Sequence, residues 1–90
     1  MSAPTPRRRS DLVVGDLADG AETALLDLDS RQVTSLNTTA AAIWYLCDGV
    51  RDAAAIADEV HRAFPQVSRA VVEADVERTI TLLTERGLLA

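Results

Sequence analysis

The spacing of apolar residues changes at Leu36 and Asn37, and this change limits the fold more than any other feature of the chain. Before it, short apolar runs are separated by Gly, Asp and Ser, which is typical of strands joined by turns. After it, apolar residues recur at helical spacing between residues that begin and end helices. A chain of 90 residues has room for one small domain. The sequence therefore predicts an α+β domain, with a sheet first and helices after it.

Three strands are expected, at residues 12–14, 23–28 and 32–36. Asp19-Gly20 and Asp29-Ser30 are the expected turns, and they favour an antiparallel meander. In the second strand one face is fully apolar and the other is mixed; the apolar face carries Ala24, Leu26 and Leu28, and the mixed face carries Thr23, Leu25 and Asp27. The third strand has no charged residue and no proline, so its edge invites pairing with another chain.

Residues 1–10 differ from the rest of the chain. They contain two prolines and arginines at positions 7–9, and they show no apolar periodicity. We expect a flexible tail here, followed by a folded domain over residues 11–90. A basic clamp for an acidic partner is the alternative for this tail.

Three helices are expected in the second half. Asn37, Asp52 and Ser68 can each cap the start of one. The first helix is expected to stop at Asp48-Gly49, the second before Pro65 and the third before Gly87.

The third expected helix has three kinds of face. A central stripe faces the core and consists of Val72, Val76, Thr79, Ile80 and Leu83. One flank is polar, whereas the other mixes two aliphatic residues with an acid and a base: Val71, Asp75, Arg78 and Leu82. This mixture suits the wall of a groove. In the alternative interpretation, Val71 and Leu82 extend the core while Asp75 and Arg78 form a surface ion pair.

The charge distribution argues against nucleic acid as a partner. Residues 11–90 contain six Arg and no Lys against fourteen acids, a formal charge of −8. Nucleic-acid binders need basic groups that displace phosphate counterions, so we expect no nucleic acid. No apolar stretch is long enough for a membrane span, and none forms a signal peptide, so we expect a cytoplasmic protein without a membrane partner.

The residue types that commonly catalyse reactions or bind metals form no recognisable motif in this sequence. Cys47 is a lone cysteine, His61 has no second histidine at helical spacing, and no glycine-rich phosphate loop is present. No motif places a base beside Cys47 or a serine. We therefore expect that the protein is not an enzyme and that it binds neither a metal nor a cofactor. What remains is a binding function carried by an open strand edge and a groove.

An ordered series of motifs resembles the PqqD-like family over about residues 12–89. The series consists of Leu36-Asn37-Thr38-Thr39-Ala40-Ala41, Ile43, Leu46-Cys47-Asp48-Gly49, Arg51, Ile56 and Leu82…Arg86-Gly87-Leu88-Leu89. The resemblance implies a winged-helix-like fold of three antiparallel strands followed by three helices, without catalysis. It also implies a peptide-binding chaperone that recognises the leader segment of a ribosomally synthesised precursor and presents it to a tailoring enzyme, such as a radical SAM enzyme or a protease.

In this family the leader adds a strand to the third strand, in the cleft against the third helix. That role carries over to Val33, Thr34 and Ser35 on the strand and to Val71, Asp75, Arg78 and Leu82 on the helix. The resemblance does not decide whether the protein serves pyrroloquinoline quinone synthesis or a lasso-peptide or other modified-peptide pathway. The rival functions are a winged-helix DNA-binding regulator and a structural subunit, including a homodimer formed through the open strand edge.

Overall fold

The computed structural model describes residues 3–16 and 22–90. Within these ranges the elements are β1 (Val13–Asp16), β2 (Glu22–Asp27), β3 (Gln32–Asn37), α1 (Thr38–Leu46), α2 (Ala53–Ala63) and α3 (Arg69–Glu85). The strands form one antiparallel sheet in the order β1-β2-β3. The predicted α+β fold, a three-stranded antiparallel sheet followed by three helices, is confirmed.

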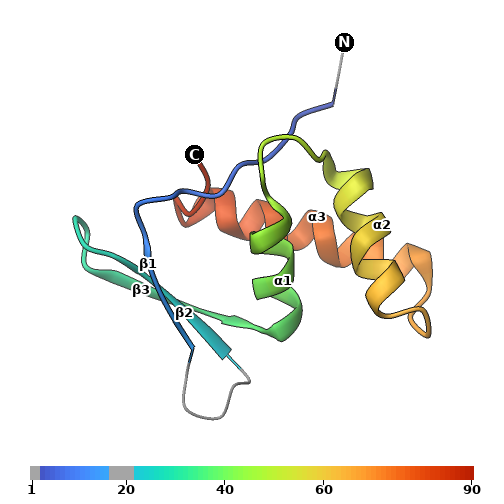
Figure 1. The fold of residues 1–90 in the computed structure, drawn as a ribbon, viewed down its shortest axis with the longest axis horizontal. Coiled ribbons are helices and arrows are strands. Elements are labelled where there is room, and N and C mark those ends of the chain that lie inside the picture. Colours follow the sequence, from blue (N-terminus) through green and yellow to red (C-terminus); the bar gives the residue numbers. More distant parts are fainter. Residues whose placement is uncertain (1–2, 17–21) are drawn as a thin grey trace.

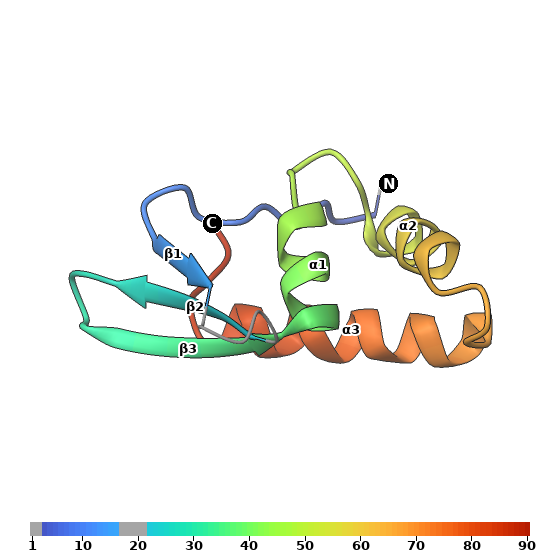
Figure 2. The same cartoon turned by 60° about the horizontal axis from the view of Figure 1, so that its bottom comes forward.

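The helices form a layer beside the sheet. α1 lies between the sheet and α2 in both views (Figure 1, Figure 2), and α3 crosses α1. The C-terminal end of α3 lies toward the sheet and its N-terminal end toward α2 (Figure 2). Because α1 follows β3 without a loop, the start of α1 is held beside the end of that strand.

The three expected helix caps are present. The side chains of Asn37 and Asp52 each accept a hydrogen bond from the backbone N–H three residues on, at 2.8 Å. Ser68 Oγ accepts one from the N–H of Val71 at 3.3 Å. Each cap satisfies a first-turn N–H that has no partner inside the helix. At the end of α3, Gly87 adopts a φ of 68°, and the N–H of Leu88 donates to Leu83 O at 2.9 Å. This left-handed glycine turns the chain back onto the core.

The expected turn at Asp29-Ser30 is also present. Asp27 Oδ1 accepts from the N–H of Asp29 at 3.0 Å, and the N–H of Arg31 donates to Asp27 O at 2.7 Å. Arg31 has a φ of 60°, which closes the hairpin between β2 and β3. The other expected turn, Asp19-Gly20, lies outside the described residues.

Two groups of buried residues hold the elements together. The first joins the three helices and contains Ile43, Cys47, Ile56, Ala57, Val60, Val72 and Val76. The second joins the sheet to α1, α3 and the C-terminal residues and contains Leu25, Leu36, Ala41, Trp44, Leu83 and Leu88. The side of β2 that packs on the helices is therefore the mixed one with Leu25, whereas Leu28 is 63% exposed.

The segment before the sheet runs along the body. The N–H of Gly49 donates to Pro6 O at 3.0 Å, the N–H of Arg8 to Cys47 O at 2.8 Å and the N–H of Ala90 to Arg7 O at 2.7 Å. Arg9 also pairs with Asp27 on β2 at 2.8 Å. Residues 6–9 therefore pair with the backbone of two neighbouring segments that have no sequence signature. The flexible tail expected over residues 1–10 as a whole stays a prediction.

Candidate functional site

β3 is an edge strand that borders the helices. In the sheet formed by the described residues it pairs with β2 alone, along residues 32–37. An edge strand offers N–H and C=O groups at strand spacing to an incoming chain. No residue from Val33 to Leu36 is charged, so neither charge nor proline blocks such pairing. The backbone of β3 can therefore accept an added strand.

The side chains of β3 alternate between two environments. Thr34 and Leu36 are buried on the helix side, at 8% and 1% exposure. Val33 is 63% exposed and Ser35 is exposed, so both lie on the outer face of the sheet. Of the three strand residues carried over from the family resemblance, Thr34 thus faces the helices, whereas Val33 and Ser35 do not.

A groove of about 300 Å³ separates the junction of β3 and α1 from α3. It is lined by Asn37, Thr39 and Ala40 at that junction and by Asp75, Arg78, Thr79 and Leu82 on α3. No Cα atom of β3 lies within 8 Å of a Cα atom of α3. Adjacent strands lie about 4.8 Å apart, so an added strand has room on this side of β3.

The mixed flank of α3 lines the groove in part. Asp75, Arg78 and Leu82 are in the lining, whereas Val71 is not. Val71 is 50% exposed and Leu82 is 37% exposed, so the interpretation in which they extend the core is wrong. The ion pair expected in that interpretation is nevertheless present, since Arg78 Nη1 lies 3.1 Å from Asp75 Oδ1.

Four residues of the groove lining are not expected there from the sequence. The sequence predicts Asn37 as a helix cap and Thr79 as part of the core stripe of the third helix. Thr39 and Ala40 carry the family resemblance but no predicted binding role. The signal that could have found them is the missing loop between β3 and α1, which forces the first turn of α1 to border the strand end.

Cys47, the single cysteine of the sequence, is not part of the groove lining. Cys47 is fully buried in the core, and its burial raises the pKa of the thiol to about 11. The thiol therefore stays protonated at neutral pH, which is unsuited to a nucleophile. Over residues 3–16 and 22–90, no three His, Cys, Asp or Glu side chains gather closely enough to hold a metal ion. Within the same ranges, no helix has the length and apolar character needed to cross a membrane.

Together, the open edge of β3 and the neighbouring groove define a class of small α+β domain in which a sheet edge and a helix flank enclose a cleft. The chain belongs to the PqqD family, since the sequence profile of the family described as coenzyme PQQ synthesis protein D (PqqD) matches residues 22–89. The family resemblance noted in the sequence is confirmed.

Two solved structures share the fold. One is TbiB1 in complex with the TbiA(beta) leader peptide, with 24% identity, a TM-score of 0.73, and coverage of 92% of this chain and 93% of that chain. The other is the solution NMR structure of the PqqD truncation of Methylobacterium extorquens PqqCD, described as a functional, stand-alone RiPP recognition element. It has 22% identity and a TM-score of 0.70, and the match covers 94% of this chain and 87% of that chain. No curated protein matches this chain.

Proposed function

We propose that this chain is a non-catalytic recognition domain that binds the leader segment of a ribosomally synthesised precursor peptide and presents it to a tailoring enzyme. The leader adds a strand to β3 and places alternate side chains in the groove against α3. The observation that carries this proposal is the position of the groove beside an uncharged strand edge that no other described strand covers. The same fold in TbiB1, which is bound to a leader peptide, supports it.

The expected contacts are sufficient for measurable binding of a peptide. An added strand makes about four to six backbone hydrogen bonds, each with a net value of about 1 kcal/mol. Leu82 adds an apolar contact within the groove, and Val71 extends the same flank of α3. After the cost of association, these contributions correspond to about micromolar affinity.

The charge of α3 favours a peptide over DNA. In a winged-helix regulator this helix would enter the major groove. Between Arg69 and Glu85 it carries two Arg against four acids, Glu73, Asp75, Glu77 and Glu85. The resulting net negative charge of α3 would repel the phosphate backbone of DNA.

The experiment compares two adjacent leucines of α3. Leu82 is 37% exposed in the groove lining, and Leu83 is fully buried in the core. Peptides are selected from a random display library against the full chain, and their binding sites are mapped by backbone amide shifts. We expect peptides that shift the signals of Val33, Ser35 and Leu82. Leu82→Asp should lower their affinity at least about tenfold while the chain stays folded.

Leu83→Ala is the matched control, and it should destabilise the fold by about 2–5 kcal/mol. If no selected peptide shifts β3 and α3 together, the proposal fails. It also fails if Leu82→Asp unfolds the chain, because Leu82 would then belong to the core. Light scattering at several concentrations tests the rival occupant of the edge, a second copy of the chain.

A further inference from the structure

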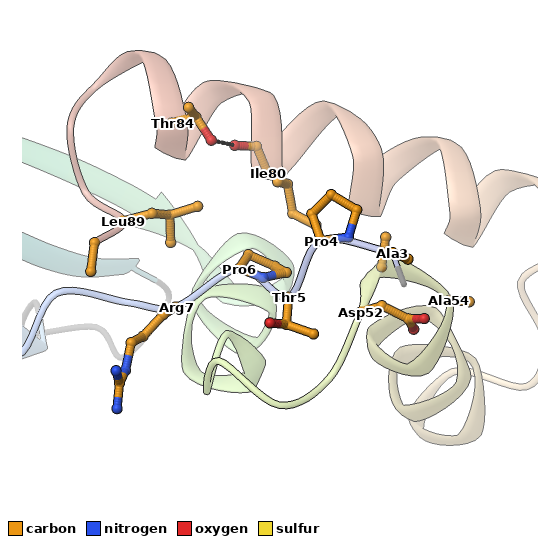
Figure 3. A pocket seen from close by; sticks show the side chains of 12 residues that line it. Ala3, Pro4, Thr5, Pro6, Arg7, Asp52, Ala54, Ile80, Thr84 and Leu89 are labelled. Carbon is orange, nitrogen blue, oxygen red and sulfur yellow. Dashed lines mark hydrogen bonds between the residues drawn. The ribbon is translucent and has the colours of Figure 1, made fainter. Parts of the chain in front are cut away.

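A second hollow (Figure 3) is lined by Ile80 and Thr84 of α3, whereas the groove is lined by other residues of the same helix. It has a volume of about 470 Å³ and is enclosed by residues 3–7, the start of α2, the last turns of α3 and the C-terminal residues. Pro4, Pro6, Ile80 and Leu89 lie around it (Figure 3). Its size falls in the range of about 300–1,000 Å³ that is usual for binding pockets. We name it the second pocket.

Hydrogen bonds fix the walls of the second pocket. Pro6 O accepts from the N–H of Gly49 at 3.0 Å, and Arg7 O accepts from the N–H of Ala90 at 2.7 Å. The Thr84 hydroxyl donates to Ile80 O at 2.8 Å, so its polar atom is satisfied within α3 (Figure 3). The lining thus offers mainly apolar surface, which suits an aliphatic or aromatic side chain.

An acidic hollow continues the second pocket between α2 and α3. It has a volume of about 210 Å³, shares Ala53 and Ala54 with the second pocket and is also lined by Glu73 and Glu77. Glu73 is paired with Arg69 at 2.9 Å. Glu77 is exposed, and its carboxylate makes no hydrogen bond or ion pair with any described residue. A basic group beside an apolar anchor would complement this arrangement.

The two sites use different flanks of one helix. At about 100° per residue, Ile80 and Thr84 project from α3 roughly half a turn away from Leu82 and Arg78. The buried stripe of α3, which includes Leu83, separates the two sites. Occupation of one site therefore leaves the other accessible, as presentation of a bound peptide to a second protein requires.

We propose that the second pocket binds a short linear segment of the tailoring protein. An aliphatic or aromatic side chain of that segment fills the pocket, and an Arg or Lys beside it contacts Glu77. The inference rests on the proposed function, because presentation requires a surface that the leader does not cover. The pocket, its acidic continuation and the separate lining of the groove support it independently of how the leader binds.

The test uses peptides selected from a random display library against the full chain and sorted by the amide signals that they shift. We expect a class that shifts Ala54, Ile80 and Thr84, and whose members carry an apolar residue near an Arg or Lys. Ala54→Phe, which adds a ring at the shared border of the two hollows, should weaken this class at least about tenfold. Glu77→Gln should weaken it about threefold to tenfold.

Matched controls separate these effects from general damage. Ala63→Phe adds the same ring at the exposed end of α2, and Glu85→Gln removes an exposed acid on another face of α3. Both should leave affinity within about twofold of the unmodified chain. The proposal is overturned if no peptide class maps to the second pocket, if that class lacks basic residues, or if Ala54→Phe and Glu77→Gln leave its affinity unchanged.

The two proposals fail in different ways. Leu82→Asp should weaken peptides that map to β3 without affecting peptides at the second pocket, and Ala54→Phe should do the reverse. Peptides at the second pocket with none at β3 would refute leader binding while the second pocket stands. Peptides at β3 with none at the second pocket would refute the second pocket alone.

Discussion

Arg78 Nη1 lies 3.1 Å from Asp75 Oδ1, and both residues line the groove between α3 and the junction of β3 and α1. The side chain of Arg78 is 75% exposed and that of Asp75 is 39% exposed, so water screens the pair. Exposed pairs of this kind contribute about 0–1 kcal/mol to stability. The pair therefore matters more for the charge that the groove presents than for the fold.

Removing one partner should change peptide selectivity. A bound peptide with an acidic residue near Arg78 competes with Asp75 for the guanidinium. We expect Asp75→Asn to strengthen binding of such a peptide by about twofold to fivefold, and Arg78→Gln to weaken it by a similar factor. Fluorescence anisotropy at low and high salt measures both effects, which should shrink as salt rises.

A peptide of the same length without acidic residues is the control, and its affinity should respond to neither substitution. The midpoint of thermal unfolding should also stay nearly unchanged in both variants, since the pair is exposed. If Asp75→Asn lowers the affinity for acidic peptides, Asp75 itself contacts the leader.

The segment before the sheet is expected to stabilise the domain. A chain that begins at Ser10 loses four backbone hydrogen bonds, made by Pro6 O, Arg7 O, Arg8 N and Arg9 N. It also loses the Arg8 guanidinium, 5.9 Å from the centre of the Trp44 ring. At about 1 kcal/mol net per hydrogen bond the four bonds contribute about 4 kcal/mol, and the entropy of ordering the segment offsets part of this, so we expect a loss of stability well below about 4 kcal/mol in urea unfolding.

Hydrogen exchange provides an independent measurement of this segment. The amides of Gly49 and Ala90 donate to it and should be protected in the full chain and unprotected in the shortened one. The amide of Leu88 is the control, because it donates to Leu83 O in both chains. Equal stability and equal exchange in the two chains would show that residues 1–10 are a flexible tail, as the sequence indicates.

Asp48 is expected to make stability sensitive to acid. The N–H groups of Arg51 and Val50 donate to its carboxylate, and the nearby Arg51 guanidinium adds to the effect, so the pKa of Asp48 is lowered. A lowered native pKa stabilises the fold above the unfolded value of about 3.9, and this contribution is lost as pH falls through the native pKa. Unfolding free energy in Asp48→Asn should therefore fall less steeply below about pH 4. An unchanged slope in Asp48→Asn would contradict a contribution from this carboxylate.

Local signals in the sequence were sufficient for most of the fold. The caps at Asn37, Asp52 and Ser68 each depend on a short polar side chain that bonds a backbone N–H three residues away, so neighbours along the chain decide them. Neighbours along the chain do not predict which face of β2 is buried. Its apolar face contains Leu26 and Leu28, yet Leu25 packs on the helices, because the register of the sheet and the position of α1 select the buried side.

In the candidate site too, local signals predict some residues, whereas others depend on how the elements pack together. Helical periodicity brought Asp75, Arg78 and Leu82 to one flank of α3, and the groove contains all three. Periodicity does not say how far along the helix the neighbouring strand reaches, so Val71 was included although it lies outside the lining. The backbone pairing of residues 6–9 could not be predicted either, since an extended segment that bridges two loops has no periodic pattern.

Cys47 should react with thiol reagents only when the chain unfolds, because it is fully buried and its pKa is raised to about 11 by that burial. The unfolded thiol has a pKa of about 8.5, so the raised native value stabilises the fold fully below about pH 8.5, and this contribution is lost as pH rises toward the native pKa. We expect slow labelling by an aromatic disulfide at pH 8, with a rate that rises in urea as the unfolded fraction rises. Cys47→Ala should reduce the loss of stability at alkaline pH. Fast labelling of the folded chain would contradict the buried position of the thiol.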